Sequence, residues 1–426
     1  MTSVSPTPVP AGDAGRRQAA MPFIMITVLI DMVSIGLIVP VLPALVGSFT
    51  ASQTEQAWWY GAVTFAFSIA NFVSSPILGA LSDRFGRRPV LLVGFCGLSL
   101  SFFVTALASA LWMLIVVRLF SGAMQSNISV ANAYVADITA PADRAKRFGL
   151  LGAMFGLGFI LGPVMGGLLG AIDLHLPFFV AGSLALINLL YGWFVLPESL
   201  PPERRRPVDW KAALNPVKSF AELGQLHGVG VLVAVVACTA LAQFILYTSW
   251  VLYTTFKFGW GPLQNGWSLF AVGVMSTLVQ GFLLGRLLKR FSPQKLAIWG
   301  LVSSTLAYVG YGAVSEGWMM FVVIVANILA FAVAASIQSI ISGAADPTTQ
   351  GRTMGAVSGL QSLMAVVAPV LSAPLLGVVS HLPRGDWRIG TPFYFCAAVQ
   401  AVALGLAWMH FRKARRTRLA ATPRPT

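Results

Sequence analysis

Two charged residues stand out because each lies inside a long apolar stretch. Asp31 is the only one of the fourteen acidic residues that lies deep within such a stretch, and Arg118 lies inside another. An ionisable side chain in hydrocarbon is costly, so such residues usually line a water-filled cavity and take part in function. A buried carboxylate that alternates between a proton and a cationic partner can couple proton movement to a second process. The other interpretation is a static buried ion pair.

A glycine- and arginine-rich stretch follows the second apolar segment, over residues 79–89. Glycine permits a tight reversal where two helices approach closely, and an aspartate there can pair with an arginine or cap the next helix. The simpler interpretation is a positively charged anchor on one side of a membrane. The residues concerned are Gly79, Asp83, Arg84, Gly86, Arg87 and Arg88.

Small residues also line the fifth apolar segment. Glycines four residues apart form a smooth helix face that lets a neighbouring helix pack closely, and a proline within the helix bends it. A close-packing face with no further role is the plain structural explanation. The residues concerned are Gly158, Gly162, Pro163, Gly166 and Gly167.

Polar and aromatic side chains within the apolar segments are candidates for a substrate cavity. Each needs a hydrogen-bonding partner in dry surroundings, so most should face inward, and about half could serve only to bond neighbouring helices. An aromatic, weakly polar cavity with one acid suits an amphipathic neutral or cationic compound. These candidates are Asn71, Gln125, Asn127, Gln243, Tyr247, Trp250, Gln280, Gln338 and Gln361.

The amino-acid composition indicates whether these residues lie in a soluble or a membrane protein. Of 426 residues, 57% are apolar and only 10% are charged, and the mean hydropathy is +0.78. A soluble domain carries about 25% charged residues. The three cysteines all lie in apolar runs, which excludes a disulfide scaffold. The chain is therefore predicted to be an integral, all-α membrane protein.

Twelve apolar stretches are long enough to cross the hydrocarbon core of a bilayer, which takes about 20 helical residues each. They predict twelve transmembrane helices, at residues 21–48, 57–81, 89–108, 111–135, 147–171, 178–196, 229–255, 262–288, 294–314, 317–343, 353–379 and 389–411.

The positive charges orient these helices. Of the 28 lysines and arginines, all but Lys257, Arg384, Arg388 and the intramembrane Arg118 fall on the side that carries both chain ends. Such an asymmetry places that side in the cytoplasm. We therefore expect a multi-pass protein of the inner (cytoplasmic) membrane with both termini cytoplasmic. The net charge of +14 then needs no nucleic acid to explain it.

The two halves of the chain echo each other. The run Gly79–Phe85 after the second helix resembles Gly285–Phe291 after the eighth, and Pro163 corresponds to Pro369 at the same offset. Repeated six-helix halves are typical of transporters that hold substrate near the midplane. The predicted division is a disordered cytoplasmic tail (1–20), two pseudo-symmetric six-helix bundles (21–196 and 229–411), a cytoplasmic linker (197–228) and a basic cytoplasmic tail (412–426).

Other classes of function find little support. The chain has no nucleophile–base pair, no metal-ligand cluster and no phosphate-binding glycine loop, so we expect no catalytic residue, no metal and no cofactor. A membrane enzyme or a receptor is thus disfavoured. The expected partners are protons, a small-molecule substrate and the lipid bilayer, with the protein acting as a monomer.

The motifs together resemble the major facilitator superfamily. Residues 79–89 match its signature loop, which in the family influences gating, and residues 158–167 are similar to the motif of its exporters. The segment Asp31–Pro43 resembles the first helix of the tetracycline/proton antiporter group. The resemblance covers about residues 23–410 and also includes 109–113, 118–122, 136–137, 177–179, 196–198, 258–260 and 316–318.

The resemblance implies export of a small amphipathic drug or metabolite in exchange for protons, with Asp31 and Arg118 in proton coupling. Proton-coupled uptake or facilitated diffusion of a metabolite would use the same fold. Tetracycline exporters carry further acids in the third and ninth helices and a histidine in the eighth. Here those positions hold Ser101, Ser304 and Ser276, which favours a substrate other than metal-chelated tetracycline.

Overall fold

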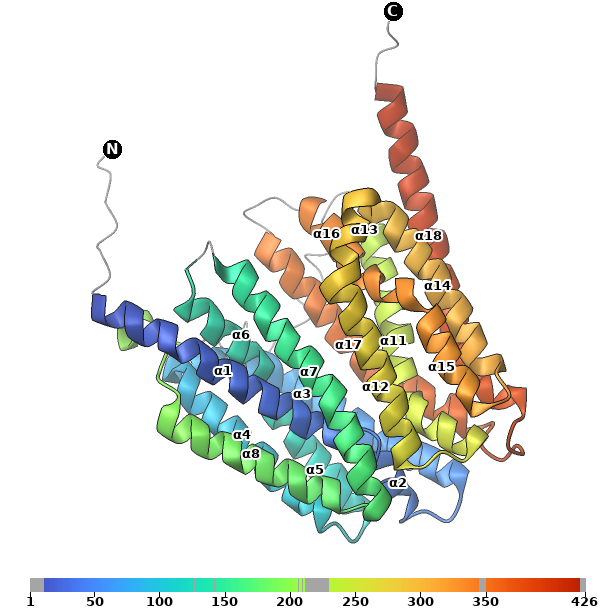
Figure 1. Cartoon of the computed structure of the whole chain (residues 1–426), viewed down its shortest axis with the longest axis horizontal. Helices are drawn as coiled ribbons and strands as arrows, with labels where there is room; N and C mark the ends of the chain where they lie inside the picture. Colours follow the sequence, from blue (N-terminus) through green and yellow to red (C-terminus); the bar gives the residue numbers. More distant parts are fainter. Residues whose placement is uncertain are drawn as a thin grey trace, which may run out of the picture.

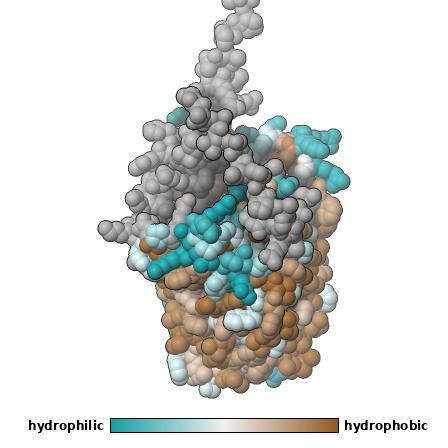
Figure 2. All heavy atoms as spheres, turned by 90° about the vertical axis from the view of Figure 1, so that its left-hand side faces the viewer, coloured by the Kyte–Doolittle hydropathy of each residue, from teal (hydrophilic) through white to brown (hydrophobic). Residues whose placement is uncertain are grey.

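The computed structural model describes residues 11–125, 127–140, 143–205, 207–208, 210, 230–344 and 350–421. Within these ranges the chain is helical and has no strand, and apolar residues cover the side shown in Figure 2 while hydrophilic ones gather toward its upper end. The start of α1 (Ala11–Ile38) and the end of α18 (Thr391–Ala421) lie at that end (Figure 1), which is called the terminal face below. The all-α membrane fold is confirmed, because the described residues form eleven helices that could cross a membrane and a twelfth candidate span made of a bent pair.

The first half of the chain forms one bundle. Its helices, including the short α2, are α1 (Ala11–Ile38), α2 (Leu42–Gly47), α3 (Gln53–Phe85), α4 (Arg87–Ala106), α5 (Leu111–Met124), α6 (Asn127–Ile138), α7 (Arg144–Ile172) and α8 (Leu176–Val195). The predicted fourth span corresponds to Leu111–Ile138, whose described parts are α5 and α6.

The second half forms the other bundle. Its principal elements are α11 (Gly230–Phe258), α12 (Pro262–Leu278), the π-helical turn η3 (Val279–Leu283), α13 (Leu284–Arg290), α14 (Pro293–Ala313), α15 (Gly317–Ala326), the 3₁₀ segment η4 (Ile328–Ala332), α16 (Val333–Ala344), α17 (Gln350–Gly377), the 3₁₀ segment η5 (Trp387–Gly390) and α18 (Thr391–Ala421). The predicted tenth span bends by 47° between α15 and the following helix.

The tail predictions differ from the structure where it describes them. Residues 11–20, expected to be disordered, form the first turns of α1. This segment is rich in alanine and follows Pro10, and alanine has the highest helix propensity while proline is tolerated at a helix start. α18 likewise continues through the predicted basic tail to Ala421. Residues 1–10, 211–229 and 422–426 lie outside the described ranges.

Two helix pairs make most of the contact between the halves in the described chain, α7 with α12 and α3 with α17. In the first pair, a Cβ placed on Gly266 would lie 2.6 Å from the carbonyl oxygen of Pro163. In the second, a Cβ placed on Gly61 would collide with Ala373 and lie 3.5 Å from the carbonyl oxygen of Pro369. The two prolines that correspond in the sequence repeat therefore occupy corresponding places at the junction of the halves.

The sides of α3 and α17 that touch at the junction lie apart from each other near the terminal face. Gly79 and Gly355 lie eighteen residues, about five turns, from Gly61 and Ala373, and so on the same sides of α3 and α17. In the described part of the chain, a Cβ on either glycine would meet no atom within 4 Å. Gly149 stands in the same relation to Gly167 on α7 and is equally unobstructed. The halves therefore touch at the end opposite the termini and separate toward the terminal face.

The apolar core follows this shape. One cluster of buried residues joins both halves and includes Leu37, Tyr60, Trp250 and Phe393. Two further clusters each belong to one half, around Tyr134 in the first and Ile337 in the second. A shared core at one end and two separate cores at the other fit a protein open toward the terminal face.

This arrangement predicts a specific cross-link. The hydroxyls of Thr54 on α3 and Ser380 after α17 lie 2.8 Å apart across the junction. In a cysteine-free background with a protease site inserted in residues 211–229, Thr54→Cys with Ser380→Cys should form a disulfide on mild oxidation, so that the cleaved halves migrate together in gel electrophoresis.

The matched control is Gly79→Cys with Gly355→Cys, on the same two helices near the terminal face. We expect this pair to cross-link more slowly. Equal rates for both pairs would show that the conformation described here is not the prevailing one.

Candidate functional site

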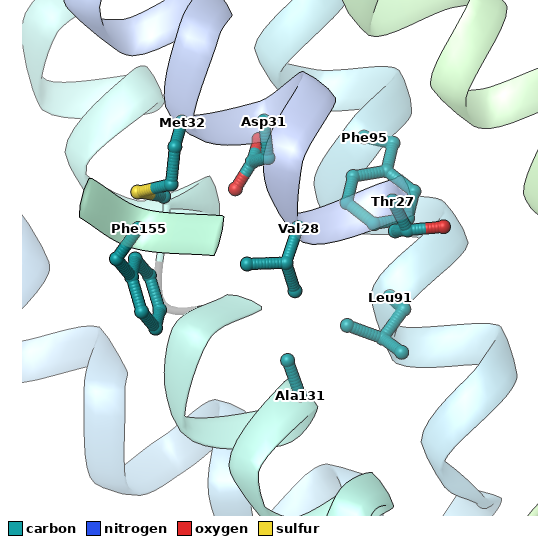
Figure 3. Close-up of a pocket in the computed structure, with 8 residues that line it drawn as sticks. All are labelled: Thr27, Val28, Asp31, Met32, Leu91, Phe95, Ala131 and Phe155. Carbon is teal, nitrogen blue, oxygen red and sulfur yellow. The ribbon is translucent and has the colours of Figure 1, made fainter. Parts of the chain in front are cut away.

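Asp31 lies inside the first bundle, where α1 packs against its neighbours. Its side chain is 5% exposed and borders a cavity of about 10 Å³, at the lower limit for holding one water molecule (Figure 3). The other residues around this cavity are Thr27, Val28, Met32, Leu91, Phe95, Ala131 and Phe155. The carboxyl group is therefore held in apolar surroundings, as expected of a group that takes up and releases a proton.

Arg118 occupies a separate part of the same bundle. It is 5% exposed, it interacts electrostatically with Tyr60 on α3, and its Nε and Nη2 atoms have no hydrogen-bonding partner among the described residues. Within that part of the chain, no ion pair or hydrogen bond joins it to Asp31. The predicted pairing of the two residues is thus not seen in this conformation.

The separation follows from the ends at which the two residues lie. Asp31 meets Leu91 and Phe95, within about two turns of the terminal end of α4, whereas Arg118 lies about two turns from the far end of α5. The similar depth predicted for the two residues was counted along each apolar stretch separately, whereas the packing of α1 against α4 sets the level of Asp31.

The glycine- and arginine-rich loop forms a compact charged network at the terminal face. Arg87, 8% exposed, pairs with Asp83 at 2.7 Å and with Asp137 on α6 at 3.0 Å, and it donates to the Ser82 hydroxyl at 2.6 Å. The loop thereby fastens α3, α4 and α6 to one another. Arg84 packs over the Phe85 ring, and the Arg88 guanidinium donates to the carbonyl oxygen of Trp193.

Glu198 completes this network, a role that the sequence analysis missed. Its carboxylate accepts hydrogen bonds from the backbone N–H groups of Arg87 at 2.9 Å and Arg88 at 3.3 Å, so it caps the N-terminus of α4. Gly86 has a φ of 106°, and a Cβ there would collide with this carboxylate. The sequence signal for this role was the position of Glu198, a single acidic residue just after the apolar span 178–196.

The glycines of α7 form two contact faces rather than one. Gly158, Gly162 and Gly166 pack against α1, and a Cβ on Gly162 would lie 2.6 Å from Gly36 Cα. Gly167 instead faces α12, where a Cβ would lie 2.7 Å from the carbonyl oxygen of Pro262. α7 is therefore in direct backbone contact with the helix that carries Asp31 and with the other half of the protein.

The polar cavity candidates are spread over both halves. Gln243 donates to the Tyr247 hydroxyl at 2.6 Å on α11, and Tyr247 is 47% exposed. Gln280, which donates to Ser276 at 2.7 Å, is also exposed. Asn71 bonds the carbonyl oxygen of Gly122 within the first bundle. Gln338 and Gln361 are exposed, Gln125 is half-buried, and the side chain of Asn127 lies outside the described residues.

Trp250 is not available to a ligand. It is 3% exposed, its indole N–H donates to the Ser268 hydroxyl at 2.9 Å, and its ring packs against Tyr311 and Phe393. A tryptophan in an apolar helix can face the cavity or the core, and the sequence does not distinguish the two.

The serines that replace charged residues of the tetracycline exporters have different surroundings. Ser101 and Ser304 are buried and donate to helix carbonyl oxygens of Gly97 and Gly300, and Ser304 also accepts from Gln400 at 2.7 Å. No group of three or more His, Cys, Asp or Glu side chains suited to a metal occurs in the described ranges.

Known proteins share both the sequence pattern and the fold. The sequence pattern of the Major Facilitator Superfamily matches residues 24–369 and 232–426. The class C tetracycline resistance protein of Escherichia coli is 36% identical over 88% of this chain and 94% of its own length. The class B protein of Escherichia coli is 33% identical over 87% and 92%.

More distant proteins extend the comparison. Multidrug resistance protein 2 of Bacillus subtilis is 27% identical over 89% of this chain and 92% of its own. The human organic anion transporter MFSD10 superposes with a TM-score of 0.69 at 22% identity, covering 92% of this chain and 99% of that one. A bacterial homologue of the lysosomal transporter Spinster, in an inward-facing conformation, gives 0.74 at 15% identity over 93% and 97%.

The charged network predicts a loss of stability on removal of one partner. Asp137→Asn leaves the nearly buried Arg87 guanidinium with a weaker acceptor, which should lower the free energy of unfolding by about 1–3 kcal/mol. The thermal unfolding midpoint of the purified protein in detergent measures this.

Asp143→Asn is the control, because Asp143 is exposed at the same face and its side chain does not cap α7. Equal midpoints for Asp137→Asn and the unaltered protein would mean that the network does not hold the three helices together.

Proposed function

This chain belongs to the Major Facilitator Superfamily, and we propose that it exports a small amphipathic drug or metabolite in exchange for protons. The observation that carries the proposal is Asp31, an acid enclosed in the apolar interior of a bundle that can open to one side of the membrane. Its relatives of 30–36% identity are named for tetracycline resistance. A membrane transporter protects a cell from such a compound by moving it outward.

The terminal face is the cytoplasmic face in this proposal, because the lysines and arginines concentrate there. The protein resides in the inner membrane, and the conformation described here is open to the cytoplasm. Substrate enters between the halves of one chain, so a monomer suffices for transport. The other conformation would close the terminal ends of α3 with α17 and of α7 with α12, and open the far ends.

Asp31 supplies the coupling. It binds a proton when it is accessible from outside and releases the proton to the cytoplasm, and the change of its charge favours one conformation over the other. Arg118 contributes a fixed positive charge in a separate part of the same bundle, and it would favour the ionised carboxylate in a conformation that brings the two side chains together. Proton release then accompanies substrate capture from the cytoplasm.

The substrate is an amphipathic neutral or cationic compound. Gln243, Tyr247 and Gln280 offer hydrogen-bonding and aromatic surface on the second bundle. Ser101 and Ser304 are neutral, and Ser304 bonds within its own bundle. These residues offer no carboxylate to a chelated metal, which supports a substrate other than metal-chelated tetracycline.

Inside-out membrane vesicles with an acidified lumen test the exchange. Addition of a transported compound should release luminal protons, which a ΔpH-sensitive dye reports, and the compound panel includes tetracycline with and without Mg²⁺. Asp31→Asn should remain in the membrane but reduce the release to the level of empty vesicles, because the amide cannot carry a proton.

Asp173→Asn is the control, since this exposed acid lies in the connection between α7 and α8. Proton release by Asp31→Asn at the rate of the unaltered protein would remove Asp31 from the mechanism. Substrate-driven proton movement in the reverse direction would identify an uptake symporter instead.

A further inference from the structure

A second buried polar group contacts the helix that carries Asp31. Asn188 lies on α8, is 1% exposed, and donates from its Nδ2 to the backbone carbonyl oxygen of Thr27 at 3.0 Å. Thr27 is itself 1% exposed, so water does not compete for this bond. The contact joins residues that are 161 positions apart in the chain.

The carbonyl that Asn188 holds belongs to the turn of α1 that presents Asp31. In an α-helix the N–H of residue 31 pairs with the carbonyl of residue 27, so the Asn188 amide shares an acceptor with the Asp31 backbone. Thr27 and Asp31 also border the same cavity. Figure 3 shows their side chains pointing in different directions, so the connection runs through the backbone rather than through the threonine hydroxyl.

We propose that Asn188 is a positioning residue that fixes the orientation of the Asp31 carboxyl group, and this rests on the proposed proton exchange. The competing explanation is that Asn188 only bonds two helices, as polar residues in membrane proteins commonly do. Its Oδ1 atom argues against that, because it is buried without a partner among the described residues. A half-satisfied amide is a poor helix contact compared with an apolar residue of similar size.

The surroundings make the Asp31 carboxyl sensitive to its orientation. The residues that border its cavity from α4, α6 and α7 are apolar. Ionisable residues also lie further along the helices that pack against α1, and each is engaged elsewhere. Tyr134 on α6 donates to the Pro197 carbonyl oxygen, and Tyr191 on α8 packs against Phe23. Arg87 on α4 is paired with Asp83 and Asp137. Arg144 and Arg147 on α7 lie at its terminal end. A small rotation of the α1 turn therefore changes the polarity around the carboxyl group.

Labelling with a carbodiimide measures the protonation of the Asp31 carboxyl group directly and requires no transport. Dicyclohexylcarbodiimide reacts with protonated carboxyl groups in apolar surroundings to give a stable N-acylurea. The purified full-length protein is treated over a range of pH, and mass spectrometry measures labelling of the peptide that contains Asp31. Asp31→Asn identifies the labelled site.

Removal of the amide should change the pH profile. In Asn188→Leu, and in the smaller Asn188→Ala, the labelling midpoint should move by at least about half a pH unit, which corresponds to the loss of one modest hydrogen bond. The matched control is Ser99→Ala, which removes a buried 2.9 Å bond from α4 to the Gly182 carbonyl oxygen on the same helix α8. Its midpoint should stay that of the unaltered protein.

The possible results separate the two proposals. Equal midpoints in the unaltered protein, both Asn188 variants and Ser99→Ala would overturn the positioning role. A shift of equal size in Ser99→Ala would also overturn it, because general loosening of α8 would then suffice. Failure of the proposed role of Asp31 would appear instead as full proton release by Asp31→Asn vesicles, and failure of the exchange itself as no release by the unaltered protein. Neither result changes the labelling comparison.

Discussion

The close backbone packing of α7 is the constraint on which the arrangement of the molecule depends. A helix that touches two neighbours at van der Waals distance cannot move against one without affecting the other. Gly162 brings α7 against Gly36 of α1, and Gly167 brings it against α12 of the second bundle. Phe155 of the same helix borders the Asp31 cavity. α7 thus links the buried acid to the junction between the halves.

The contacts of the first bundle differ between its two ends. Near the terminal face, Arg87 and Glu198 tie α3, α4, α6 and the segment after α8 together through charged groups and helix ends. Away from that face, apolar side chains and glycine backbone make most of the contact. A few hydrogen bonds add to it, such as Gln56 to the Pro43 carbonyl oxygen and Thr54 to Ser380 across the junction. The charged network holds the first bundle together at the terminal face, while the junction between the bundles at the other end is mainly apolar. The bundles can therefore rotate as units, because each bundle remains intact when the halves separate.

Several details of the elements were beyond the sequence pattern. Hydropathy predicted the span near 317–343, but not the 47° bend after Ala326. Apolar residues flank this bend on both sides, so a hydropathy window detects one continuous segment. The π-helical turn at Val279–Leu283 was equally hidden, since it adds one residue to a turn without changing composition.

The amino-acid sequence alone determined that this is a helical membrane protein of two related halves, how its loops are charged, and that Asp31 lies within an apolar span. These properties depend on local composition and spacing, because the preference of each segment for lipid or water follows directly from its own residues. Tertiary structure decided that Arg118 lies apart from Asp31, that Trp250 is core rather than cavity, that Glu198 caps α4, and that Asn188 reaches the Asp31 turn. Each of these depends on how distant helices are rotated and how far along their length they contact one another. The 3.6-residue helical period of a sequence shows which residues share a helix face, but not which helix packs against that face or at what height.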